Sequence, residues 1–60
     1  MYVCKLYANG VPEQTVTFET LVEAELWACE NARVVPETGT RFTVSIYTDT
    51  SAFPLAIVLE

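Results

Sequence analysis

The 60-residue chain carries eight acidic and three basic residues, a net charge of −5, and 52% of its residues are hydrophobic. Such a composition is too apolar for a disordered chain, and the length allows one domain, residues 1–60, which buries only about 60% of its unfolded surface. The negative charge opposes binding to nucleic acid or to an anionic membrane, so we expect neither as a direct partner.

The first two predicted elements are strands joined by a tight turn. Residues 2–8 are rich in β-branched and aromatic residues, and Asn9-Gly10 follows as a turn that tolerates positive φ at both positions. The returning strand, residues 11–18, alternates apolar residues with threonines. Because Pro12 cannot donate to a sheet ladder, this strand belongs at a sheet edge or at a bulge.

A capped helix is predicted next. Thr20 can accept a hydrogen bond from the amide of Glu23, while the Glu23 carboxylate can reach back to the amide of Thr20. We expect the helix to run from about Leu21 to Arg33 and to end before Pro36. Arg33 would then lie beside the negative end of the helix dipole.

The remaining elements are a loop and two strands. Residues 34–40, VVPETGT, are expected to form a connecting loop. Residues 41–48 alternate apolar with polar side chains, which predicts a strand with one buried face. After a turn at residues 49–52, the segment 53–59 is predicted to be a last strand; it is apolar on both faces, and we therefore expect both to be covered.

These elements predict an α+β fold in the order strand, strand, helix, strand, strand. A right-handed crossover makes the second and third strands parallel, so an all-antiparallel sheet requires the first strand to lie between them. The expected sheet order is 2-1-3-4, with the helix packed on one face. A sheet that lacks the strand containing Pro12 is the alternative.

The predicted helix has two apolar surfaces. At about 100° per residue, alanines form one of them, which we expect to pack on the sheet with Leu21 and Trp27 at its ends. Val22, Leu26 and Cys29 form the second, turned from the first by a right angle or more, and one small sheet cannot cover both. The expected core residues are Leu21, Ala24, Trp27, Ala28, Phe42, Val44 and Ile46.

The second apolar surface therefore needs another cover. A second copy of the chain is the simplest, because a two-fold dimer pairs a surface with itself. The last strand offers another route if it lies at the sheet edge, where a partner could extend it. Glu25 lies at the seam between the two apolar surfaces, so its carboxylate either reaches solvent or fixes the register of an interface. The predicted interface residues are Val22, Glu25, Leu26, Cys29, Ala56 and Val58.

The sequence predicts no catalytic, cofactor or metal site. Without histidine there is no Ser-His or Cys-His pair, and two glycines cannot form a phosphate-binding loop. Cys4 and Cys29 both fit as small buried hydrophobes of a reduced, cytoplasmic protein, since the N-terminus shows no export signal. Whether the two cysteines approach each other stays open.

An acidic strip on the helix, formed by Glu19, Glu23 and Glu30, suggests a rival function. Carboxylates at one-turn spacing could imitate the phosphates of DNA and occupy a basic cleft of a nucleic-acid enzyme, as in anti-restriction or anti-CRISPR proteins. An acidic surface is more often simply a solvated one. A structural component of a larger assembly is a third possibility.

Residues 16–32, VTFETLVEAELWACENA, combine a strand end, a capped helix and the pattern E-A-x-x-W-A. This segment resembles small accessory proteins encoded by bacteriophages, particularly phages of actinobacteria. The resemblance implies a protein made in the bacterial cytoplasm during infection that acts by binding, and it assigns no active site. We therefore expect a non-enzymatic protein-binding module that binds itself, as a homodimer or larger, or a host protein.

Overall fold

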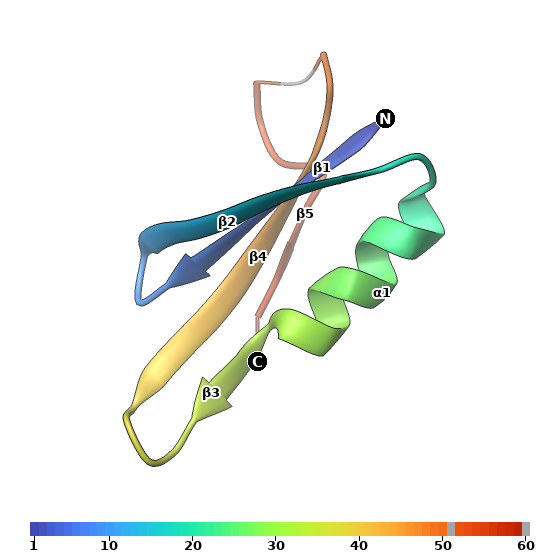
Figure 1. Cartoon of the computed structure of the whole chain (residues 1–60). Helices are drawn as coiled ribbons and strands as arrows, with labels where there is room; N and C mark the ends of the chain where they lie inside the picture. Colours follow the sequence, from blue (N-terminus) through green and yellow to red (C-terminus); the bar gives the residue numbers. More distant parts are fainter. Residues whose placement is uncertain (51, 60) are drawn as a thin grey trace.

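A computed structural model describes residues 1–50 and 52–59 as a five-stranded antiparallel sheet with one helix across one face (Figure 1). The α+β fold expected from the sequence is confirmed. Ser51, part of the expected turn 49–52, lies outside the described residues. The elements are β1 (Tyr2–Ala8), β2 (Val11–Phe18), α1 (Leu21–Asn31), β3 (Arg33–Val35), β4 (Thr40–Thr48) and β5 (Ala56–Val58).

The strands β1 and β2 form the predicted hairpin. Asn9 and Gly10 have φ values of 51° and 83°, the positive values that the two-residue turn requires. The register shifts between Leu6, which pairs with Gln14, and Tyr7, which pairs with Pro12. Pro12 thus lies beside a bulge in an edge strand, as its missing N–H predicts, and the alternative sheet without this strand is wrong.

The central strand pair is β1 and β4, and β2 lies at one edge. Both β3 and β5 pair with the other side of β4: β3 opposite Thr40–Phe42 and β5 opposite Val44–Ile46. The order of the four strands expected from the sequence is therefore confirmed, and β3 is an addition to it. Residues 34–40, expected as a loop, instead contain most of β3 and a hairpin turn, in which the Gly39 amide donates to the Val35 carbonyl at 2.8 Å.

The helix ends earlier than predicted. Its last residue is Asn31, and Ala32 caps it in an extended conformation with ψ of 111°. Arg33, expected in the last helical turn, instead pairs with Phe42 in β3, so no basic residue lies in that turn. Recruitment of the β-branched Val34 and Val35 into the sheet explains the early end, because a strand residue cannot also be helical.

The last strand is also shorter than the predicted segment 53–59. β5 covers Ala56–Val58 only, and the Leu55 amide adds one hydrogen bond to the Ile46 carbonyl at 2.6 Å. Beyond Val58 the edge of β4 is already occupied, since Arg33 of β3 pairs with Phe42. At the other end Pro54 has no N–H to donate.

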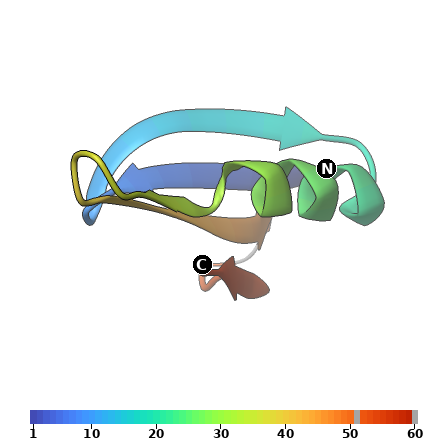
Figure 2. The same ribbon diagram turned by 90° about the horizontal axis from the view of Figure 1, so that it is seen from below.

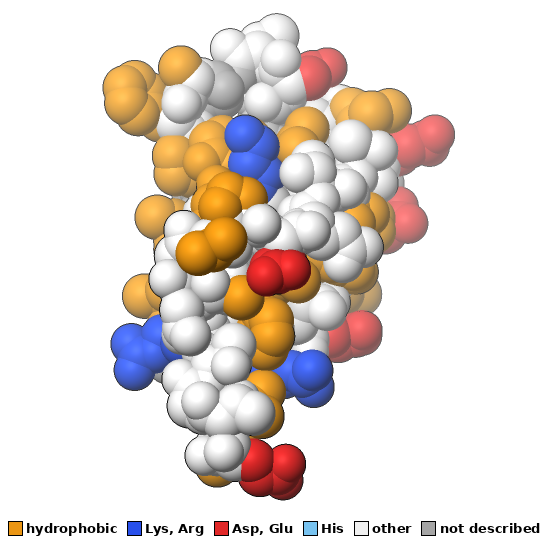
Figure 3. All heavy atoms as spheres, turned by 60° about the vertical axis from the view of Figure 1, so that its left-hand side comes forward, with side chains coloured by type: hydrophobic (Ala, Val, Ile, Leu, Met, Phe, Trp, Pro, Cys, Tyr) orange, Lys and Arg blue, Asp and Glu red, His pale blue; other side chains and the backbone are white. Residues whose placement is uncertain are grey.

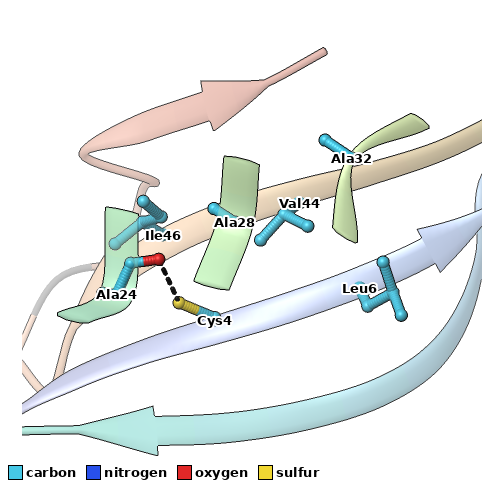
Figure 4. Close-up of a cluster of buried hydrophobic side chains, with 7 residues drawn as sticks. All are labelled: Cys4, Leu6, Ala24, Ala28, Ala32, Val44 and Ile46. Carbon is cyan, nitrogen blue, oxygen red and sulfur yellow. Dashed lines mark hydrogen bonds between the residues drawn. The ribbon is translucent and has the colours of Figure 1, made fainter. Parts of the chain in front are cut away.

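The core lies between α1 and the β1–β4 pair (Figure 4). The alanines expected against the sheet are buried, and so are Val44 and Ile46, as predicted. Trp27 and Phe42 are half-buried at the margin of the core, whereas Leu21, expected inside, is 37% exposed. Buried residues of the core are Cys4, Leu6, Ala24, Ala28, Ala32, Val44 and Ile46.

Candidate functional site

The helix α1 turns one flank towards β2 and the opposite flank towards the β5 edge. The Trp27 ring packs on Phe18 of β2, with ring centroids 6.0 Å apart, which fixes the first flank. Figure 2 shows β2 on one side of α1 and β5 on the other. The flank away from β2 carries Val22 and Leu26, which are 68% and 59% exposed, together with the exposed Cys29.

The strand β5 adds apolar side chains on the same side of the molecule. Ala56 and Val58 are in register with Ile46 and Val44, both of which point towards α1. Val58 is half-buried against the core and Ala56 is exposed. The α1 residues predicted for the interface are therefore exposed, and those of β5 face the side of the sheet on which α1 lies. We call this set, Val22, Leu26, Cys29, Ala56 and Val58, the apolar surface.

Glu25 is exposed beside this apolar surface. Within the described residues, no hydrogen bond or ion pair joins its carboxylate to another group. The position matches the expectation of a carboxylate that reaches solvent. Its other predicted role, fixing the register of an interface, requires a partner chain and stays a prediction.

The acidic strip is fully on the outside of the molecule. Glu19, Glu23 and Glu30 are all exposed. The Glu23 amide donates to the Thr20 hydroxyl at 3.3 Å, which confirms the cap. The Glu23 carboxylate accepts from the same hydroxyl at 2.9 Å, where the sequence predicted the Thr20 amide. Helix capping thus uses one member of the strip, and Glu19 and Glu30 are left to solvent or to a partner.

The two cysteines have different environments. Cys4 is buried, as expected, with its Sγ 3.7 Å from the Ala24 carbonyl oxygen, and burial raises the pKa of its thiol. Cys29 is exposed, so the expectation that it is buried is wrong. The reason is geometric: α1 rests on the sheet through Ala24 and Ala28, and Cys29 follows Ala28 about 100° around the helix. Both thiols are free.

The sheet face turned away from α1 was not singled out from the sequence. Lys5 and Ser45 are in register, as are Tyr7 and Thr43, and these alternate with the core residues. We call this set the open face: Val3, Lys5, Tyr7, Thr15, Thr17, Arg41, Thr43, Ser45, Tyr47 and Ile57. Figure 3, seen from the side away from α1, shows hydrophobic side chains interspersed with other uncharged atoms, basic side chains in the upper middle and at the margins, and acidic side chains near the middle and at the margins.

Two aromatic contacts organise the open face. The Lys5 ammonium lies 5.0 Å from the centroid of the Tyr47 ring, within cation–π range. The pKa of Tyr7 is raised, first by partial burial and then by a hydrogen bond with Tyr47 and the charge of the Tyr47 side chain. Part of this cluster could be predicted from the sequence, because Lys5 and Tyr7 are two residues apart on one strand and therefore point to the same face. Their approach to Tyr47 depends on the pairing of β1 with β4, which the sequence does not specify residue by residue.

The described residues contain no group of three or more side chains that could hold a metal ion, and no pocket is found among them. No helix in this part of the chain is both long enough and apolar enough to cross a membrane. The candidate sites are thus surfaces, not cavities.

These features define a small α+β domain whose antiparallel sheet is covered by one helix on one face. No protein-family model, curated protein or solved structure matches the chain. The resemblance of residues 16–32 to phage accessory proteins therefore stays a prediction.

Proposed function

We propose that the chain is a non-enzymatic protein-binding module that associates with a second copy of itself through the apolar surface. The observation that carries the proposal is the distribution of large hydrophobic side chains. Among the described residues, ten are exposed by 37% or more, whereas the only large aliphatic side chains in the buried core are Leu6, Val44 and Ile46. The free chain thus leaves much of its apolar surface in water.

Covering the apolar surface would change the stability of the protein substantially. Complete burial of a Val or Leu side chain contributes about 1.5–3 kcal/mol, so burying the exposed parts of Val22 and Leu26 contributes about 1–2 kcal/mol each. A domain this small rarely has more than about 3–5 kcal/mol of stability from its own core. Association would therefore add a large fraction of the total.

The biological setting we propose is that of a phage-type accessory protein in the bacterial cytoplasm. The resemblance of residues 16–32 supports this setting, and the lack of a pocket among the described residues favours binding over catalysis. In this setting a host protein is the other occupant that could cover the apolar surface.

The test is the solution mass, measured by light scattering on a sizing column with reducing agent present. We expect wild-type protein to be a dimer or larger and the Leu26→Glu variant to be folded and monomeric. Val11→Glu is the matched control, because it adds the same charge at a residue that is 58% exposed on β2, far from the apolar surface. A Leu26→Glu variant with the wild-type mass would contradict self-association through the apolar surface.

A second candidate function is inhibition of a nucleic-acid enzyme through the acidic strip. It is favoured by the exposure of Glu19 and Glu30, neither of which is ion-paired within the described chain. This function requires a basic protein partner whose affinity falls steeply with salt and is lost when Glu19→Lys and Glu23→Lys are combined. A partner that binds equally well at high salt would argue against it.

A further inference from the structure

The charges around the apolar surface disfavour pairing α1 with a second α1. Every charged residue of α1 is acidic, namely Glu23, Glu25 and Glu30. Glu25 lies on one side of the Val22–Leu26 stripe, and the acidic strip lies on the other. A two-fold helix pair would therefore bring carboxylates of one copy towards those of the next, which is unfavourable. Arg33, whose guanidinium lies 5.6 Å from the Phe42 ring centroid, supplies one positive charge against these three.

The open face has the opposite character. It carries Lys5 and Arg41, two of the three basic residues of the chain, and within the described residues neither is ion-paired with a carboxylate. Ile57 of β5, 58% exposed, lies in one row with Ser45 and Lys5. The open face thus combines basic side chains with apolar and hydroxyl ones, and Ser45 in its middle is buried, whereas the outer surface of α1 is apolar and acidic.

The spacing of the charges on the two surfaces is compatible. Arg41 lies four residues along β4 from Ser45, the partner of Lys5 on the neighbouring strand, so the two basic positions are about 13 Å apart along the strands and about 5 Å apart across them. Glu23 and Glu30 are seven residues apart on α1, about 10 Å along the helix axis. Long basic side chains can bridge the difference, so both ion pairs can form at once.

From this complementarity we propose that a second copy docks the outer surface of α1 on the open face, head to tail. The inference rests on the proposed self-association and specifies its two surfaces. Because the two surfaces differ, each copy retains one of each, and the assembly is a closed ring or an open filament rather than a two-fold dimer.

Complementation between two variants tests the arrangement. The first, Lys5→Glu with Arg41→Glu, alters the open face and leaves α1 intact. The second, Leu26→Glu, alters α1 and leaves the open face intact. Each variant alone is expected to be monomeric, and an equimolar mixture is expected to form a 1:1 dimer by light scattering. Circular dichroism of each variant verifies folding, and Lys5→Gln with Arg41→Gln replaces the first variant if it is unfolded.

The outcomes separate this inference from the proposed function. If the open-face variant keeps the wild-type mass while Leu26→Glu is monomeric, self-association stands and the head-to-tail arrangement is wrong. If both variants are monomeric and stay so when mixed, the arrangement is also wrong. A monomeric wild type overturns both proposals. Salt provides an independent check, because added salt should weaken a head-to-tail contact at least several-fold and strengthen a contact between two acidic helices.

Discussion

The substitution Leu26→Ala measures whether the apolar surface is covered in solution. Leu26 is 59% exposed in the single chain, so about two-fifths of its side chain is buried. Since full burial contributes about 1.5–3 kcal/mol, truncation should cost the single chain about 1 kcal/mol or less, with no cavity term at an exposed position. Within a covered interface, Leu→Ala substitution should cost about 2–4 kcal/mol, because the remaining contacts are lost and a cavity forms.

The assay is urea unfolding followed by Trp27 fluorescence at a low and at a high protein concentration. If a second copy covers Leu26, the destabilisation by Leu26→Ala should grow with concentration, since association stabilises the folded state by mass action. Ile46→Val is the control: Ile46 is fully buried in the single chain, so its cost of about 0.5–1.5 kcal/mol should not depend on concentration. A cost of Leu26→Ala below about 1 kcal/mol at every protein concentration would mean that no second copy covers Leu26.

Three further predictions concern the fold itself. Thr20→Ala removes the helix cap and should lower the free energy of unfolding by about 1 kcal/mol in urea titrations. Thr20→Asp should retain most of the stabilisation that the cap provides. Gly10→Ala should cost about 1 kcal/mol in the same assay, because Gly10 has a φ of 83° that alanine disfavours. Steric contact adds nothing, since no atom beyond its neighbours lies within 4 Å of an added Cβ. A neutral result would mean that the turn relaxes. A thiol reagent should modify Cys29 at once and Cys4 only on unfolding. Because burial raises the Cys4 pKa in the folded state, stability should fall as pH rises above the ordinary thiol range, and Cys4→Ala should reduce that fall.

The sequence predicted the elements whose signals are local. The Asn9-Gly10 turn, the Thr20 cap and the existence of β4 each depend on residues close together in the chain, and each was confirmed. The predicted alternation of burial in β4 is broken at Ser45, which is buried between Val44 and Ile46. The sheet order followed from one non-local rule, the handedness of the crossover. The predicted interface residues Val22 and Leu26 are exposed on α1, and Ala56 and Val58 of β5 face the same side of the sheet as α1.

The errors in the extent of the helix, the loop and the last strand have a different cause, which is pairing at one edge of β4. β4 has a single edge free of β1, and both Arg33–Val35 and Ala56–Val58 use it. Each segment therefore limits how far the other can extend along β4, and no window of the sequence around either segment contains that information. The pairing of β3 with β4 also places Arg33 outside the helix, and Leu59, predicted to be in the last strand, is 65% exposed beyond β5.

The composition of the core connects these details to association. α1 meets the sheet through Ala24, Ala28 and Ala32, which allows close approach but buries few carbon atoms per residue. The helix residues that could bury more, Val22 and Leu26, point to the outside. A chain of 60 residues that builds its internal contact from alanines has little stability to spare, and a second layer over the larger side chains would supply it. The small contact with the sheet and the large exposed apolar surface are therefore two consequences of the same helix, and a low stability of the single chain would match a large gain on association.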